Sequence, residues 1–590
     1  MSTKNKNMFA NSKDISIKYS FKSKQVWLLV ITSSALLSLP FLSPHLGLLS
    51  LVAFLPLLAA EQIAFENKIK YFFIRYYICF FLWNLATTYW IYNATVPGMI
   101  AAVVLNALQM SIVFWLFRKM RTISQGFLPY LFLIIAWLAW EHIYFEWEVS
   151  WPWLVLGNAF STSIKNIQWY EYTGVLGGSL WILLVNILLF RFIYNFLSLT
   201  KLQKIVSGIS LALLVLLPVI ISHIMFYTYK ETQYEPSVGC GIRQFVVLQP
   251  NIDPYTDKFY GMSQHEQNTV LINLAKEALS EIKDEPVLVV APESFISRPP
   301  LVLENNPLAN RNFMHIYNFV RSCNSFTGDL DSTVSLKDKH NQVSFILGAI
   351  TDTIYYNYAF RAENKANIPP TATARYIQDN NLWFDRSNSA VFIDSKGKPR
   401  FYHKSKLVVL VESTPYKRLF NFMSRFAIDL GGAMGSYAPQ QDREVFTTSD
   451  SVKIGTAICY ESVYGDYYRE YILKGAHVMS IITNDGWWGD TPGYRQHLSY
   501  ASLRAIETRR SIARSANTGI SAFINQRGEI TACTEWWKPA YLNGELALNN
   551  KITVFVKYGD IIGRLAVFMF CLFTLMAVVR YIGNRYTAVR

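Results

Sequence analysis

Hydrophobic and polar residues are distributed unevenly along this chain. Apolar residues crowd approximately the first 230 positions and return in about the last 30, whereas the stretch between them has the mixed character of a globular domain. A helix needs about 20 apolar residues to cross the hydrocarbon layer of a bilayer. The pattern therefore predicts eight membrane-spanning helices, approximately over residues 26–42, 45–60, 70–92, 97–117, 127–145, 173–193, 206–228 and 561–579.

The stretch between residues 230 and 560 alternates short apolar runs with polar segments. Residues 262–283 and 495–513 have helical spacing of apolar positions, and residues 394–397 and 525–528 have turn composition. Short β-branched runs bounded by turns are typical of buried strands. This stretch is predicted to form an α/β domain, with strands at 245–248, 287–290, 343–350, 391–393, 454–458, 478–482 and 520–524.

Composition and charge placement indicate that the chain is a membrane protein and how it is oriented in the membrane. Only 16% of the residues are charged, against about a quarter in soluble domains, and the net charge is +14. The basic residues cluster before the first predicted span and after the fourth, sixth and eighth, as expected for cytoplasmic ends. This placement argues against nucleic-acid binding and puts the predicted α/β domain outside the cytoplasm. The first span has a long basic leader and no small-residue cleavage site, so we expect it to remain as an anchor.

The six cysteines do not indicate a metal or redox centre. No CxxC pair is present, so a thiolate zinc site has little support. Cys79 and Cys571 lie in apolar spans, where packing is the simplest interpretation. Whether Cys240, Cys323 and Cys533 form disulfides is left open by the sequence.

Three reactive residues directly follow strand-like runs. Glu293 follows VLVVAP, Lys404 follows RFYH and Cys459 follows KIGTAI. Each residue alone is weak evidence, since a cysteine at the end of an apolar strand is usually packed and a lone Glu or Lys is usually solvated. A residue just past a strand lies at the rim of its sheet, and the case for taking the three residues together comes from the resemblance described next.

The motifs around these residues resemble the nitrilase superfamily. Pro-Glu at 292–293, YHKSKLV at 402–408, ICYE at 458–461 and TNDGWWG at 483–489 carry the resemblance. Enclosure by apolar spans, WPW at 151–153, RQH at 495–497 and ARSANTG at 513–519 make the chain similar to the bacterial apolipoprotein N-acyltransferases within that superfamily. One departure stands out, because VVLVE at 408–412 replaces the family's Val-Pro-Phe-Gly-Glu.

The resemblance implies a fold and a domain organisation. It implies a membrane α-helical bundle of about eight transmembrane helices joined to an extracytoplasmic α/β domain, a nitrilase-like αββα sandwich. The implied divisions are a cytoplasmic basic N-terminus at 1–25, a transmembrane domain of about seven helices at 26–229, a catalytic domain at 230–559, and a final transmembrane helix with a cytoplasmic tail at 560–590.

The resemblance also implies a reaction. Cys459 would take a fatty acyl chain from a membrane phospholipid as a thioester and pass it to the free α-amine of an S-diacylglyceryl-cysteine at a lipoprotein N-terminus, by ping-pong catalysis. Glu293 would be the general base and Lys404 an oxyanion donor. Glu412 would hold Lys404, while Tyr460 and Glu461 would shape the pocket. Lys406 is a nearby alternative to Lys404, although the spacing to Leu407-Val408 favours Lys404.

Five further residues are weaker candidates for substrate binding. His497, Asn484 and Trp487 could line the pocket, although a histidine on such a helix is more often packed than catalytic, and core packing is at least as common for a residue like Trp487. Phe420 and Phe422 belong to an apolar cluster at 418–426, which is either a mobile arm at the membrane interface or a helix packed on the domain.

The expected partners follow from the implied reaction. They are a phospholipid acyl donor and a diacylglyceryl apolipoprotein acceptor, with no metal or organic cofactor and a monomer in the bacterial inner membrane. A membrane-anchored nitrilase-type amidase, with water as acceptor, is the alternative enzyme. A transporter or receptor with a ligand-binding outer domain is the alternative from another class, but few charged residues lie inside the predicted spans.

Overall fold

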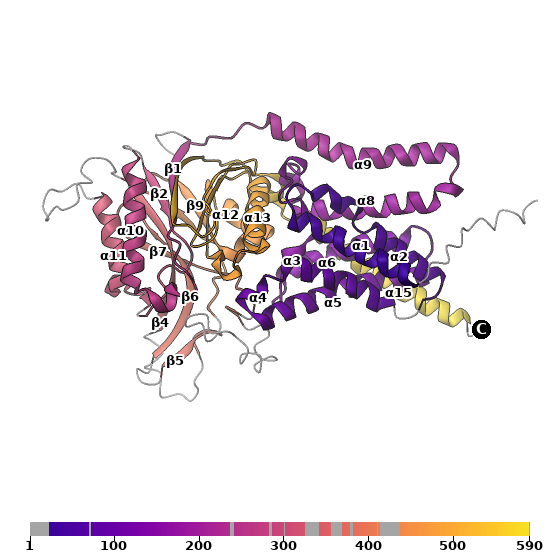
Figure 1. Ribbon diagram of the computed structural model, residues 1–590, viewed down its shortest axis with the longest axis horizontal. Helices are drawn as coiled ribbons and strands as arrows, with labels where there is room; N and C mark the ends of the chain where they lie inside the picture. The colour runs from indigo at the N-terminus through magenta and orange to yellow at the C-terminus, as the bar shows by residue number, and fades with distance from the viewer. Residues whose placement is uncertain are drawn as a thin grey trace, which may run out of the picture.

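Two parts follow one another along the long axis of the protein, a helical region and an α/β region (Figure 1). The structure is a computed structural model that describes residues 23–69, 72–235, 241–282, 286–299, 301–324, 342–355, 369–377, 382–409, 411–413 and 437–588. The chain builds the helical region first, crosses to the α/β region after residue 228, and returns through the last helix. The predicted combination of a helical region with an α/β domain is confirmed.

The helical region contains a helical segment at each of the eight predicted spans. Within the described residues, seven segments are long and apolar enough to cross a membrane, one fewer than expected. The exception is α3 (Phe72–Thr88), which at 17 residues lies at the lower limit for a span. The others are α1 (Ser23–Leu42), η1 and α2 (Gly47–Val52, Leu55–Glu66), α5 (Val96–Ile123), α6 (Leu128–Glu146), α8 (Val175–Asn195), α9 (Lys201–Thr228) and α15 (Ile561–Ala588).

Two stacked sheets form the centre of the α/β region. The first has the strand order β14-β1-β2-β4-β6-β5, with β3 paired to β4 and β7 to β6, and the second has the order β13-β12-β11-β10-β9-β8. The strands are β1 (Ile242–Gln249), β2 (Val287–Val290), β3 (Val302–Leu303), β4 (Val343–Tyr355), β5 (Arg375–Ile377), β6 (Leu382–Ile393), β7 (Pro399–His403), β8 (Val445–Thr447), β9 (Lys453–Ile458), β10 (Val478–Thr483), β11 (Ile512–Ala516), β12 (Ala522–Ile524), β13 (Ile530–Cys533) and β14 (Ala540–Ala547).

Helices cover the outer faces of both sheets. α10 (Gln264–Ser280) and α11 (Arg311–Asn324) pack on the first sheet, while α12 (Gly465–Leu473) and α13 (Pro492–Thr508) pack on the second (Figure 1). β2 and β10 are parallel to both of their neighbours, and β9 and β11 are parallel to β10 between them. These strands are buried on both faces, which explains their apolar runs. The result is an αββα arrangement.

The predicted helix at 495–513 is wrong at its C-terminal end. α13 ends at Thr508, Arg509 takes a left-handed conformation, and β11 begins at Ile512. Because α13 and β11 are both almost entirely buried, apolar spacing alone does not mark the point where one becomes the other. The predicted turns at 394–397 and 525–528 do connect adjacent strands, β6 to β7 and β12 to β13.

α13 joins the α/β region to the helical region. The side-chain oxygen of Gln496 accepts hydrogen bonds from the indole N–H groups of Trp90 at 3.2 Å and Trp153 at 2.7 Å. The carboxylate of Glu507, at the other end of α13, accepts a hydrogen bond from the backbone N–H of Val175 at 3.0 Å. These buried polar contacts fix the helix, and with it the carboxyl ends of β9 and β10, against the helical region.

Candidate active site

Glu293 lies just beyond the carboxyl end of β2, in a segment pressed against β4. A Cβ atom at Gly348 would lie 2.5 Å from the Cα of Glu293, so only glycine permits this approach. The next residue, Ser294, has a φ of +51°, which turns the chain sharply after the carboxylate. Asn388 Nδ2 donates to Glu293 Oε1 at 2.8 Å. The backbone path thus holds a buried carboxylate at the rim of the first sheet.

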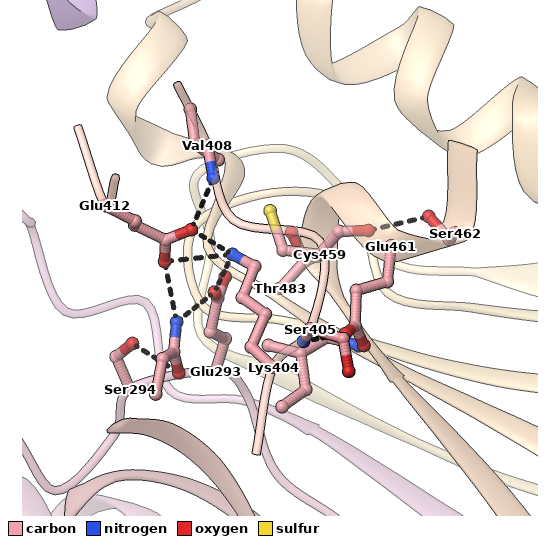
Figure 2. Close-up of polar contacts among 12 residues, drawn as sticks. Glu293, Ser294, Lys404, Ser405, Val408, Glu412, Cys459, Glu461, Ser462 and Thr483 are labelled. Carbon is pink, nitrogen blue, oxygen red and sulfur yellow. Dashed lines mark hydrogen bonds and ion pairs between the residues drawn. The ribbon is translucent and has the colours of Figure 1, made fainter. Parts of the chain in front are cut away.

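Lys404 brings two carboxylates together at the end of β7. Its Nζ lies 3.0 Å from Glu293 Oε1 and 3.0 Å from both oxygens of Glu412 (Figure 2). Burial disfavours the ammonium, but Glu293 and Glu412 raise the pKa of Lys404 well above its ordinary value. Lys404 is therefore a permanent buried cation. Lys406 instead contacts Glu146 and the carbonyl of Phe145 in the helical region.

The segment that departs from the family pattern still delivers Glu412 to Lys404. The backbone N–H of Glu412 donates to the carbonyl of Val408 at 2.8 Å, and Glu412 Oε2 accepts the Val408 N–H at 2.8 Å. Asn388 Nδ2, which also holds Glu293, donates to Glu412 Oε1 at 2.9 Å. The carboxylate itself closes this turn, so the missing Pro and Gly are not needed for its position.

Cys459 starts a tight turn at the carboxyl end of β9. Its φ of +51° is unusual for a residue with a side chain and points to backbone strain at this position. The thiol of Cys459, a half-buried residue, lies beside Glu293, Lys404 and the hydroxyl of Thr483 (Figure 2). Burial, together with the charge of Glu293, raises the pKa of the Cys459 thiol well above its usual value, despite the opposing charge of Lys404. The resting thiol is neutral and needs a base to become a nucleophile.

Glu461 holds the turn that carries Cys459 rather than lining a pocket. Its carboxylate accepts backbone N–H groups from Ile458 at 2.8 Å and Ser405 at 2.6 Å, and a hydroxyl from Tyr467 at 2.6 Å. It thereby ties the segment after Cys459 to the segment after Lys404. Burial raises the pKa of Glu461. The neighbouring Tyr460 does line the cavity described below.

A second buried cluster of polar side chains contacts the backbone carbonyl of Cys459. His497 Nε2 lies 3.2 Å from the carbonyl oxygen of Cys459, and its Nδ1 lies 3.0 Å from Asp485 Oδ1. Arg514 forms an ion pair with Asp485. Burial opposes ionisation of Asp485, but Arg514 and His497 hold its pKa below its usual range. This cluster couples β10, α13 and β11 to the turn at Cys459.

An apolar cavity of about 410 Å³ connects these groups with the helical region. Its inner end is lined by Glu293, Lys404 and Cys459, and its outer part by residues 91–109 on α4 (Ile91–Ala94) and α5. Trp151 and Trp153 line its wall with stacked rings 5.1 Å apart. Most of the lining is carbon, as expected for a site that holds hydrocarbon chains.

The predicted site residues fall into three groups. Glu293, Lys404, Glu412, Cys459 and Tyr460 meet at the inner end of the cavity, and Asn484, Trp487 and His497 also line it. Glu461 lies behind the turn. Phe420 and Phe422, with the rest of the 418–426 segment, lie outside the described residues.

Sequence reasoning missed Asn388, which donates to both carboxylates, and the Asp485–Arg514 pair. A polar Asn beside the predicted buried strand at 391–393 was the available signal. Among the described cysteines, Cys79, Cys323, Cys459, Cys533 and Cys571 are all free, and Cys240 lies outside the described residues.

Comparison with known proteins identifies both parts of the chain. Residues 33–188 match the apolipoprotein N-acyltransferase N-terminal domain and residues 363–551 match the carbon-nitrogen hydrolase domain. The chain is 26% identical to the apolipoprotein N-acyltransferase of Chlorobaculum tepidum, over 91% of this chain and 93% of that protein. It is also 26% identical to the apolipoprotein N-acyltransferase of Geobacter metallireducens, over 91% of this chain and 92% of that protein.

Solved structures similar to part of the chain include two proteins that are each covered almost completely. A carbon-nitrogen hydrolase from Helicobacter pylori is 16% identical with a TM-score of 0.34, covering 54% of this chain and 94% of that one. Nit3 from Saccharomyces cerevisiae, a member of the nitrilase superfamily, is 13% identical with a TM-score of 0.35, covering 54% of this chain and 95% of that one.

Proposed function

The chain belongs to the apolipoprotein N-acyltransferases, which are multi-pass membrane proteins, and we propose that it transfers an acyl chain through a thioester on Cys459. The function of the family implies a phospholipid as acyl donor and a lipoprotein as acceptor. One observation carries the proposal. The Glu293–Lys404–Glu412 cluster and the Cys459 thiol share the inner end of an apolar cavity that reaches the helical region. A neutral thiol, a carboxylate base and a fixed cation are the parts needed for nucleophilic attack on an ester.

The first half-reaction forms the thioester. Glu293 takes the proton of the Cys459 thiol as sulfur attacks the ester carbonyl of the phospholipid. Lys404 and the backbone N–H of Tyr460 stabilise the tetrahedral oxyanion. The C–O bond then breaks, and Glu293 returns the proton to the departing oxygen of the lysophospholipid.

The second half-reaction forms the amide. The free α-amine of an S-diacylglyceryl-cysteine attacks the thioester carbonyl, and Glu293 takes a proton from the attacking nitrogen. The carbon–sulfur bond breaks and the Cys459 sulfur recovers the proton. The apolar lining favours this reading over the amidase alternative, because an amidase with a small polar substrate has no use for a cavity lined mainly by carbon.

Intact-mass spectrometry of the detergent-purified protein tests the thioester. Incubation with phospholipid should add one fatty acyl mass to wild type, which hydroxylamine removes and which Cys459→Ala lacks. Addition of a diacylglyceryl-cysteine peptide should then move the acyl group onto the peptide amine. Release of free fatty acid at the same rate with and without the peptide would point instead to the amidase.

We further propose that the α/β region lies on the extracytoplasmic side of the inner membrane. The basic clusters on α5 and α8, represented by Arg121 and Arg191, lie near the C-terminal ends of helices whose N-terminal ends adjoin the α/β region. Arg580, near the end of α15, donates to Ser124 Oγ at 3.1 Å and so lies at the same distal end. Basic residues mark the cytoplasmic ends of spans, which supports an outward-facing α/β region.

Labelling of Cys533 tests this orientation. Cys533 is free and exposed on β13 of the α/β region. A membrane-impermeant maleimide added to spheroplasts should give a labelled protein, and Cys533→Ser should lose the corresponding mass. Labelling of Cys533 only after lysis would place the α/β region in the cytoplasm.

A further inference from the structure

A second, smaller hollow adjoins the inner end of the apolar cavity. It has a volume of about 80 Å³, several times the space that one water molecule needs. Glu293, Glu412, Asn484 and Trp487 line both spaces, so the hollow opens onto the groups proposed to react. The lining of the smaller hollow is far more polar in proportion than that of the larger cavity, which suits a different part of a substrate.

Three hydrogen-bond donors that line this hollow have no partner among the described residues. Ser297 Oγ and Asn484 Nδ2 are buried atoms that form no hydrogen bond with any described residue. The Lys258 ammonium forms no hydrogen bond or ion pair within the part of the chain that the structure describes; it lies 5.7 Å from the centre of the Phe259 ring. These residues are only 3% (Lys258), 4% (Asn484) and 6% (Ser297) exposed. A buried donor without an acceptor is costly, so such a set is expected to meet its acceptor in a ligand.

The backbone fixes Lys258 in this place. Its N–H donates to the carbonyl of Asp253 at 2.8 Å, and its carbonyl accepts from Gln267 at 2.8 Å and Arg298 at 3.0 Å. Burial lowers the pKa of Lys258 to about 8, with Glu293 opposing the shift. The Lys258 side chain is therefore protonated in most molecules at neutral pH.

Among the described residues, neither carboxylate on the wall of the hollow forms an ion pair with Lys258. Glu293 and Glu412 already receive hydrogen bonds from Lys404 and Asn388. One cation, Lys258, and two neutral donors, Ser297 and Asn484, are together suited to bind an anionic group that has several oxygen atoms. An acceptor peptide offers a cationic amine and neutral carbonyls near the reacting atoms, whereas a glycerophospholipid offers a phosphodiester.

We infer that Lys258, Ser297 and Asn484 form a binding site for the phosphodiester of the phospholipid donor. The inference rests on the proposed function. The glycerol unit separates the reacting ester from the phosphate by only a few bonds, so an ester at Cys459 with its chain in the apolar cavity puts the phosphate in the adjoining hollow. Arg and Lys contacts to phosphate are charge-assisted and strong, and they would also hold the lysophospholipid until it leaves.

Paired donors with and without a phosphate test the inference. Acylation of Cys459 is measured with a phosphatidylethanolamine and with p-nitrophenyl palmitate, which has a reactive ester and no phosphate. Lys258→Met should slow acylation by the phospholipid about tenfold or more and change acylation by the p-nitrophenyl ester less than about threefold. Lys258→Arg should restore most of the phospholipid rate, and Ser297→Ala should have a smaller effect in the same direction.

The controls separate binding of the phosphate from other roles. Lys396→Met, at an exposed lysine in the turn between β6 and β7, should leave both donors unchanged. Retained reaction with the p-nitrophenyl ester shows that the Lys258→Met protein is folded. Equal slowing with both donors, or no slowing with the phospholipid, would overturn the phosphate site. Absence of acylation by either donor in wild type would instead contradict the proposed function.

Discussion

At the scale of single residues, the charge count of the buried cluster explains why Glu293 is suited to receive a proton. Glu293 and Glu412 both pair with Lys404, so these three side chains together carry one excess negative charge in a site largely shielded from water; the Lys258 cation acts on Glu293 from the adjoining hollow without forming an ion pair with it among the described residues. A proton moved from Cys459 to Glu293 makes the cluster neutral and leaves the thiolate beside Lys404. Buried charges require such pairing, and this arrangement moves the unpaired charge onto the attacking sulfur.

The two neighbouring lysines should differ sharply in their effect on catalysis. Lys404→Met is expected to slow acylation of Cys459 by about 10²–10³-fold, because it removes a positioned donor and leaves two buried carboxylates without a cation. Lys406→Met should change the rate less than about threefold, since the ion pair of Lys406 is with Glu146, whose side chain is 64% exposed. Rapid-quench kinetics with p-nitrophenyl palmitate compares the two variants. Similar rates for both would show that the cluster has been misassigned.

At the scale of elements, the candidate site depends on three segments that meet next to the turn at Cys459. β10 leads into Asp485, α13 carries His497 and β11 carries Arg514. Their polar contacts converge on the carbonyl of Cys459, so the strained turn at Cys459 is held by elements that are far apart in sequence. A strained backbone persists only where its surroundings fix it in this way.

Asp485→Asn should destabilise the protein in a pH-dependent manner. Loss of one partner leaves Arg514 buried without a counter-charge, which typically costs about 3–5 kcal/mol. Because the folded-state pKa of Asp485 lies below its unfolded value, the contribution is complete above about pH 3.9 and declines as the pH falls, by about 1.4 kcal/mol per pH unit. Thermal unfolding in detergent should therefore give a constant gap between wild type and variant from about pH 5 to 7, and a narrower gap below about pH 4. A gap independent of pH would show that the Asp485 charge is not responsible.

At the scale of the whole molecule, the helical region completes the candidate active site. The candidate catalytic groups come from the α/β region, but the outer part of the apolar cavity is lined by residues of α4 and α5. Asn93 Nδ2 donates to the carbonyl of Trp488 at 2.7 Å, which fixes α4 to the segment after β10. The proposed acyl transfer therefore has an apolar space that reaches from the helical region to Cys459.

Filling this cavity from α5 should select against long acyl chains. Ala101→Phe places a ring in the cavity, so acylation by a palmitoyl donor should fall about tenfold while an octanoyl donor changes much less. Leu108→Phe, at an exposed position of α5 outside the cavity lining, is the matched control and should leave both rates unchanged. The ratio of palmitoyl to octanoyl acylation rates is the measurement. An equal loss for both chain lengths would mean that this space does not hold the acyl chain.

The sequence by itself determined the features that depend on local periodicity and composition. The apolar segments of α5, α8 and α9, the buried runs of β2, β9 and β10, and the motif residues Glu293, Lys404 and Cys459 were all readable from short stretches of chain. A helix that crosses a hydrocarbon layer and a strand that is buried on both faces both require apolar residues over a continuous stretch of chain. Their hydrophobic pattern can therefore be recognised within that stretch alone.

Only the tertiary structure decided which residues meet. Asn388 donates to two carboxylates 95 and 24 residues away, Lys258 lies near Glu293, and Arg514 pairs with Asp485, 29 residues away. Where α13 stops and β11 begins is likewise set by burial on all sides rather than by apolar spacing. Contacts between distant segments leave no periodic trace, because each partner is chosen by the three-dimensional packing of the sheets and helices rather than by its neighbours in the chain.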